Sequence, residues 1–368
     1  MHLFLTGATG SVGLEVLRTL RTDSRFKRVT CLLRGTESES AEYRWQHFLE
    51  EHHLQGPVDG CGPVLDYLEG DILKPDLALT VLQTEGLQRS VTHILHLAAY
   101  IRFDASYDEA YAINVEGTRH LLEMAKRCRS LRGFGHVSTL YVVGTRQGKL
   151  PENAEPEGSF NNAYEQTKYE AEQLVRASGL PADIYRLALL QGRSEDGYVH
   201  HFLESHMLMD AFCRGSCALL PGSPTARLDM LPTDYTAQAL VRLLAEQSFS
   251  GRIWSIAAGD SAPSIAELYQ LICQRMVMSG QLPPSAPGYI DQTTLQKILQ
   301  SDDPYEYGIS PGACAILEIV AGYLFYPKIY TPSVIPSMPP PPMPAEWMEP
   351  VLDYCLASGW GRRRVNTN

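Results

Sequence analysis

Several features that mark membrane proteins, disulfide-rich domains or zinc ribbons are missing from this sequence of 368 residues. The longest late apolar stretch, residues 313–326, contains Glu318 and is shorter than the roughly 20 residues that span a bilayer. No basic segment precedes the first apolar residues, so no signal peptide is predicted. The eight cysteines include no Cys-x-x-Cys pair, which argues for reduced thiols. The chain is therefore predicted to be cytoplasmic, with no membrane span.

Positive charge is also scarce. The 31 lysines and arginines stand against 42 aspartates and glutamates, which gives a net charge of -11. This balance argues against binding to nucleic acid and against electrostatic adhesion to an anionic membrane, although a local basic site for a phosphate remains compatible with it. Only 9% of the residues are aromatic, but 44% are hydrophobic, which is typical of a folded globular protein.

Short apolar runs alternate with segments of helical periodicity over the first half of the chain. Strands are predicted at residues 2–6, 28–33, 64–69, 92–97, 133–137 and 183–190, and a later one at 252–257. This alternation indicates βαβ units, a parallel sheet and helices on both faces. The predicted fold class is α/β, a doubly wound parallel sheet of the Rossmann type with a smaller, mainly helical C-terminal lobe.

Three glycines, Gly7, Gly10 and Gly13, lie between the first predicted strand and the first helix with the spacing G-x-x-G-x-x-G. Such a turn lets the backbone approach a pyrophosphate, which the helix N-terminus attracts. A flexible turn is the alternative, but the position at the start of a βαβ unit favours a dinucleotide. The predicted contacts are Thr6, Gly7, Thr9, Gly10, Ser11, Val12 and Gly13.

The end of the second strand, about 20 residues beyond Gly13, distinguishes NAD from NADP. NAD enzymes carry an acid there, whereas this chain has Arg34, whose guanidinium can hold a 2′-phosphate. NADP(H) is therefore the predicted cofactor, with a solvated arginine as the alternative. Further contacts are predicted where the third and fourth strands end, at Asp71, Ile72, Leu97, Ala98 and Ala99.

The pattern loosens after Gly192, where the chain is predicted to leave the sheet. Helices are predicted at residues 199–212 and 233–245, before the last strand returns to the sheet. We therefore predict a dinucleotide-binding domain formed by residues 1–192 and 225–260. Residues 193–224 and 261–368 are predicted to form a substrate-binding lobe.

Tyr164 and Lys168 are spaced i and i+4, so they share one face of a helix predicted at residues 162–178. The pair is common by chance, but this helix follows a strand that ends in Ser138 and Thr139, at the edge where the cofactor is expected. A lysine near a phenol favours the phenolate, and a nearby hydroxyl orients a carbonyl. The arrangement is suited to hydride transfer to a carbonyl.

Three histidines, His200, His201 and His206, are the candidate metal ligands of this sequence. The last two are five residues apart, and no carboxylate completes a known ligand set. No metal ion is predicted.

Taken in order, the motifs resemble the extended short-chain dehydrogenase/reductase superfamily. The matching segments are residues 6–13, Asp71, residues 97–99, residues 114–118, Ser138-Thr139 and residues 164–168. Segments 31–34, 70–75, 136–144 and 164–172 are most similar to the thioester-reductase and fatty-acyl-reductase branch. The resemblance covers about residues 3–258, with one departure at Leu187, where the family usually has proline.

The resemblance implies that Tyr164 is the general acid, Lys168 its activator and ribose ligand, and Thr139 the partner of the substrate oxygen. It also implies that Asn114 belongs to the catalytic set through a water or backbone link to Lys168.

The implied activity is NADPH-dependent reduction of an acyl thioester to an aldehyde or alcohol. No adenylation or carrier domain fits in this chain, so the thioester would arrive on a separate acyl carrier protein or on coenzyme A. An NADP-dependent ketone or aldehyde reductase of secondary metabolism, or an alcohol dehydrogenase, is the first alternative. A non-catalytic NADP-binding sensor or scaffold is the second.

Overall fold

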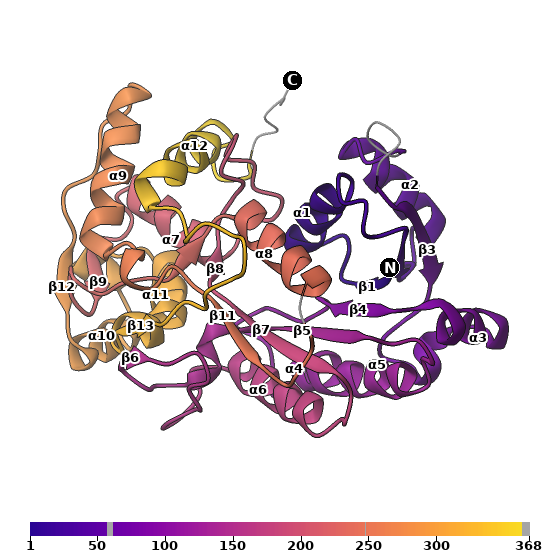
Figure 1. Ribbon diagram of the computed structural model, residues 1–368. Coiled ribbons are helices and arrows are strands. Elements are labelled where there is room, and N and C mark those ends of the chain that lie inside the picture. Colours follow the sequence, from indigo (N-terminus) through magenta and orange to yellow (C-terminus); the bar gives the residue numbers. More distant parts are fainter. Residues whose placement is uncertain (57–61, 247, 363–368) are drawn as a thin grey trace.

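A seven-stranded sheet runs through the centre of the computed structural model, which describes residues 1–56, 62–246 and 248–362 (Figure 1). Its order is β3-β2-β1-β4-β5-β7-β11, and all neighbours are parallel. The strands are β1 His2–Thr6, β2 Arg28–Leu33, β3 Val64–Glu69, β4 His93–His96, β5 Gly133–Thr139, β7 Ala182–Leu187 and β11 Ile253–Ile256. The strand order reverses between β1 and β4, and doubly wound sheets bind ligands at the carboxyl ends of the strands at such a point.

Helices cover both faces of the sheet (Figure 1). One face carries α1 Ser11–Leu20, α2 Ala41–Glu51 and α8 Thr233–Glu246, and the other carries α3 Val81–Ser90, α5 Gly117–Lys126 and α6 Ala163–Arg176. Because side chains alternate along a strand, Leu3 and Leu5 join one core while Phe4 joins the other. The short helix α4 Tyr107–Tyr111 continues through a π-helical turn, Ala112–Glu116, into α5. The predicted α/β fold is confirmed.

The remaining elements gather at one end of the sheet, on the left in Figure 1. The helices there are α7 Glu204–Cys213, α9 Ile265–Met278, α10 Gln292–Leu299, α11 Pro311–Leu324 and α12 Pro344–Ala357. Three parallel strand pairs accompany them, namely β6 Gly148–Leu150 with β13 Lys328–Tyr330, β8 Leu189–Leu190 with β10 Met230–Leu231, and β9 Leu219–Pro221 with β12 Gly288–Ile290. These elements bury their own apolar core around Trp347 and Leu317. The exact division into two domains stays a prediction.

Two predicted elements need correction. The strand predicted at 183–190 stops at Leu187, and the chain then turns to pair with a different strand, since the Leu189 N–H donates to the Asp229 carbonyl at 3.0 Å. The helix predicted at 199–212 begins only at Glu204. In the segment before it, the His200 ring contacts the Thr9 carbonyl at 3.1 Å.

The cysteines behave as predicted within the part of the chain that is described, where all seven are free thiols. The eighth, Cys61, lies outside the described residues.

A left-handed turn follows β3. Asp76, Leu77 and Ala78 have φ values of 51°, 58° and 55°, a region that costs an L residue roughly 1–2 kcal/mol. The turn is tied down on both sides, because the Leu77 carbonyl accepts from the Asp71 N–H at 2.8 Å and Arg127 pairs with Asp76. The fold therefore stores strain directly beside the predicted cofactor residue Asp71.

Replacing the exposed Ala78 by glycine is expected to increase the free energy of unfolding by about 0.5–1 kcal/mol, because glycine adopts this φ without steric cost. Thermal and urea denaturation measure the change. As the matched control, Ala315→Gly on the exposed face of α11 should lower stability by about 1 kcal/mol. Equal destabilisation by both variants would show that the turn is not strained.

Candidate active site

The glycine-rich turn between β1 and α1 has room for backbone only. Gly7 has a φ of +73°, and a Cβ there would lie 2.7 Å from the Ala98 nitrogen. A Cβ on Gly13 would lie 2.3 Å from the Gly7 carbonyl oxygen. Helix α1 starts at Ser11, with Gly10 as its N-cap and no side chain capping it. The first-turn N–H groups of Ser11, Val12 and Gly13 therefore form a cradle that fits the pyrophosphate of a dinucleotide.

The exits of β1 and β4 are bonded to each other beside this turn. Thr6 accepts from the Leu97 N–H with its carbonyl at 3.2 Å and from the Ala98 N–H with its hydroxyl at 3.3 Å. The Thr9 carbonyl on the turn is contacted by His200 at 3.1 Å. The structure thus brings together Thr6, Gly7, Leu97 and Ala98 as the sequence predicts.

Two guanidinium groups lie at the end of β2. The Arg34 side chain is 61% exposed and lies 4.0 Å from the Asp71 carboxylate. Arg44, from α2, donates to the Arg34 carbonyl. Arg44 could not be predicted from the sequence, because no local pattern indicates which face of α2 lies toward the end of β2.

The exit of β3 is fixed against α5. The Ile72 carbonyl oxygen lies 2.8 Å from His120 Nδ1. The Ile72 side chain fills the space that a Cβ on Gly117 would need. Asp71 accepts from the Leu73 N–H at 2.9 Å. These contacts hold both predicted residues at the carboxyl edge of the sheet.

The predicted hydroxyl and phenol are in contact. Thr139 ends β5 and Tyr164 lies on the first turn of α6. Burial raises the pKa of Tyr164 above its ordinary value of 10, and the nearby Thr139 hydroxyl acts in the opposite direction. The phenol is therefore protonated at neutral pH, as a general acid must be.

Lys168 is 2% exposed and lies one helical turn further along α6. Its Nζ donates to the Val137 carbonyl at 2.6 Å and lies 3.3 Å from His136 Nε2. Burial lowers the pKa of Lys168 to about 8, and the carboxylate of Glu172 acts in the opposite direction. Near neutral pH the ammonium is the main form, so it can stabilise negative charge on a nearby phenol.

Asn114 is 1% exposed and lies within the π-helical turn, a feature frequent at functional sites. Its Oδ1 accepts from the Tyr100 N–H at 2.8 Å. Its Nδ2 donates to the Tyr100 carbonyl at 3.1 Å and to the Thr167 hydroxyl at 3.0 Å. Asn114 thus ties the segment after Ala99 to the residue before Lys168, and the water or backbone link to Lys168 itself stays a prediction.

Aromatic rings surround Tyr164. Its ring centroid is 5.6 Å from that of Phe103, which lies equally far from Tyr323. Tyr323 packs edge-on against Tyr141 at 4.6 Å and comes from α11, far along the chain. Its hydroxyl accepts from Asn162 Nδ2 at 2.9 Å. These rings were missed from the sequence because their proximity depends on where the late helices pack.

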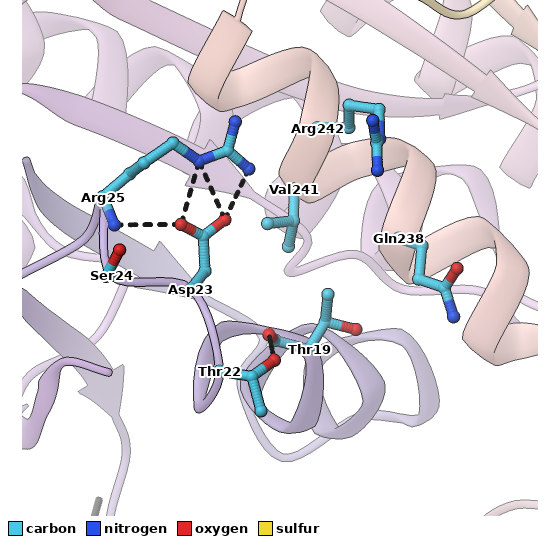
Figure 2. Close-up of a pocket in the computed structure, with 8 residues that line it drawn as sticks. All are labelled: Thr19, Thr22, Asp23, Ser24, Arg25, Gln238, Val241 and Arg242. Atoms are coloured by element: carbon cyan, nitrogen blue, oxygen red, sulfur yellow. Dashed lines mark hydrogen bonds and ion pairs between the residues drawn. The ribbon is translucent and has the colours of Figure 1, made fainter. Parts of the chain in front are cut away.

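A pocket of about 490 Å³ lies elsewhere, between the end of α1 and α8 (Figure 2). Its lining residues are Thr19, Thr22, Asp23, Ser24, Arg25, Gln238, Val241 and Arg242. The pocket lies near the amino end of β2, at the edge of the sheet opposite the one that carries Tyr164. Inside it, the Asp23 carboxylate pairs with the Arg25 guanidinium, with 2.6 Å between Oδ2 and Nη2. None of the predicted catalytic or cofactor-binding residues lines this pocket.

Within residues 1–56, 62–246 and 248–362, no group of three His, Cys, Asp or Glu side chains could hold a metal ion. His206 instead accepts from the Leu203 N–H at 3.0 Å. In the same described part of the chain, no helix is long and apolar enough to cross a membrane.

The sheet order and the glycine turn are those of an extended short-chain dehydrogenase/reductase, a class of NAD(P)-dependent oxidoreductases. Residues 5–240 match the profile of the male sterility protein family, and the chain belongs to that family. The predicted membership in the thioester-reductase and fatty-acyl-reductase branch is confirmed.

Two relatives and one solved structure illustrate the similarity. The chain is 29% identical to the nonribosomal peptide synthetase asaC of Aspergillus flavus over 69% of its own length and 26% of that protein. It is 33% identical to the alcohol-forming fatty acyl-CoA reductase of Simmondsia chinensis over 41% of its length and 33% of that protein. The chain thus matches about a quarter to a third of the length of these relatives.

The structure is similar to that of the terminal R domain from the myxalamid PKS-NRPS biosynthetic pathway. The TM-score is 0.75 at 23% identity, over 99% of this chain and 92% of that one. This likeness shows a shared fold over nearly the whole chain.

Proposed function

We propose that this protein is an NADPH-dependent reductase of acyl thioesters held on an acyl carrier protein or on coenzyme A. The observation that carries the proposal is the grouping of Thr139, Tyr164 and Lys168 at the carboxyl edge of the sheet, where Lys168 is buried one helical turn beyond Tyr164 on α6. The kinship with a nonribosomal peptide synthetase and with a fatty acyl-CoA reductase supports a thioester over a free carbonyl.

The protein's own residues supply acid catalysis and orientation. NADPH, held by the glycine turn, would supply the hydride to the thioester carbonyl. Thr139 would hydrogen-bond the carbonyl oxygen, and Tyr164 would donate its phenolic proton to the oxyanion that forms, giving a hemithioacetal. Lys168 would stabilise the resulting phenolate. As the carbon–sulfur bond of the hemithioacetal breaks, its hydroxyl proton would pass to the sulfur, which releases a thiol and an aldehyde. Conversion of the aldehyde to an alcohol would require a second molecule of NADPH and a second proton.

The assay that tests this proposal follows NADPH oxidation, free thiol and aldehyde together, with a series of acyl-coenzyme A and acyl-carrier thioesters. Thiol release in step with NADPH loss supports the proposal. NADPH loss with free ketones or aldehydes alone would replace the thioester by the first alternative. If no carbonyl compound is reduced while NADPH changes the affinity for a protein partner, the scaffold alternative is correct.

The choice of NADPH rests on the guanidinium groups of Arg34 and Arg44 at the end of β2. Arg34→Ala is expected to weaken NADPH binding by about 10- to 100-fold and to leave NADH binding nearly unchanged, because only NADPH carries the 2′-phosphate. Quenching of protein fluorescence gives both dissociation constants. Arg89→Ala on α3, which removes an exposed arginine paired with Glu85, is the matched control and should change neither. A wild-type preference for NADH would contradict the assignment.

A further inference from the structure

His136 is a buried histidine that the proposed chemistry does not use. It lies on β5, is 0% exposed, and stands directly beside His96 in the sheet register. The two ring centroids are 5.4 Å apart. The side chain of His136 has one polar contact among the described residues, the 3.3 Å approach of its Nε2 to Lys168 Nζ.

The chemistry of the two groups fixes the tautomer of His136. An ammonium only donates hydrogen bonds, so Nε2 must be unprotonated to accept from Lys168. A neutral imidazole then carries its proton on Nδ1, and this atom is buried without a partner. Burial, together with the charge of Lys168, holds the pKa of His136 well below its ordinary value. The ring therefore stays neutral over the working pH range.

The neighbouring His96 cannot take over this role. Its Nδ1 lies 2.7 Å from the Thr6 hydroxyl, and its Nε2 lies 3.0 Å from the Thr118 hydroxyl. Burial lowers the pKa of His96 to about 3, and Lys168 contributes to the shift. Both ring nitrogens of His96 are occupied, so of the two histidines only His136 has a lone pair available to Lys168.

We propose that His136 is a positioning residue for Lys168. Its Nε2 and the Val137 carbonyl take up two of the three ammonium N–H groups and leave the third for the ribose of the cofactor. This inference rests on the proposed function in one respect, because it assumes that Lys168 assists the proton transfer from Tyr164.

The inference predicts a change in pH dependence. Among the described residues, the other titratable groups that act on Lys168 or lie beside it are Glu172 and Tyr164 on α6 and His96 on β4. Glu172 is itself paired with Arg186 on β7. Activity requires the ammonium form, so it falls as the pH rises through the pKa of Lys168, at about 8. Loss of an acceptor destabilises the ammonium, which lowers that pKa. In a plot of kcat/KM against pH, the fall in activity on the alkaline side should therefore move to lower pH.

Three substitutions test this prediction in the full chain. His136→Leu removes the acceptor, His136→Gln places an amide oxygen at the same number of bonds from Cβ as Nε2, and His136→Asn places it one bond too short. We expect this alkaline fall in activity to move down by roughly one pH unit in the Leu and Asn variants and to stay near the wild-type position in the Gln variant. Thermal unfolding of each variant controls for folding. Identical profiles for Gln and Asn would overturn the proposal.

A second readout needs no catalytic activity. In protein labelled with ¹⁵N-histidine, the His136 signals, assigned by their loss in the Gln variant, should show a protonated Nδ1 and an unprotonated Nε2. A protonated Nε2 would rule out acceptance from Lys168 and overturn the proposal. If wild-type protein reduces no carbonyl compound, the proposed function fails, and the tautomer alone decides whether His136 holds Lys168.

Discussion

Replacing Tyr164 by phenylalanine is expected to lower kcat by about 10²- to 10⁴-fold and to change the dissociation constant of NADPH by less than about twofold. The variant keeps the ring that packs on Phe103 but loses the phenolic proton donor beside Thr139. The glycine turn that would hold the pyrophosphate is untouched. Steady-state rates and a fluorescence titration with NADPH measure the two effects separately.

Tyr169→Phe is the matched control for this experiment. It removes a hydroxyl from the same helix, one that donates to Glu155 at 2.9 Å. Its kcat should stay within about threefold of wild type, because Tyr169 belongs to no part of the proposed proton transfer. If the Tyr164 variant kept most of its activity, the general acid would have to be another group.

Removing the carboxylate of Glu172 is expected to lower the free energy of unfolding by about 3–5 kcal/mol. Glu172 is 0% exposed and accepts two hydrogen bonds from Arg186, which is 1% exposed, at 3.0 and 2.7 Å. Arg186 also donates to the Ala154 carbonyl at 2.6 Å. The substitution Glu172→Ala leaves a buried guanidinium without its counter-charge, and urea denaturation measures the loss.

Two further variants separate the buried pair from ordinary surface charge. Glu85→Ala breaks the exposed pair with Arg89 and should cost less than about 1 kcal/mol. The double variant Glu172→Ala, Arg186→Met removes both buried charges and should recover much of the lost stability. A single Glu172→Ala variant as stable as wild type would mean that Arg186 finds solvent or another acceptor.

The parts of the fold that depend on local sequence could be predicted. The glycine turn is specific because Gly7 and Gly13 meet backbone atoms that leave no space for a Cβ. The i, i+4 spacing put Tyr164 and Lys168 on one face of α6, and the end of β5 put Thr139 beside them. Each of these signals lies within a few residues of the feature that it predicts.

The parts that depend on long-range packing could not be predicted. The break after Leu187 arises because Leu189 and Leu190 pair with Met230 and Leu231, about 40 residues later in the chain. The segment before α7 contacts the turn at Thr9 through His200, nearly 200 residues earlier in the chain. Arg44 and Tyr323 reach the site from α2 and α11 for the same reason, since composition and periodicity do not give the orientation of one helix against another.

The side chain of Asn162 has a consequence for engineering substrate scope. Its Oδ1 accepts from the Glu165 N–H at 3.0 Å and so caps α6, while its Nδ2 donates to Tyr323 on α11. One amide thus joins the first turn of the helix that carries Tyr164 to the C-terminal third of the chain. A chimaera that takes its C-terminal helices from a relative should therefore keep a hydroxyl at position 323, or exchange Asn162 at the same time, so that the first turn of α6 keeps its position.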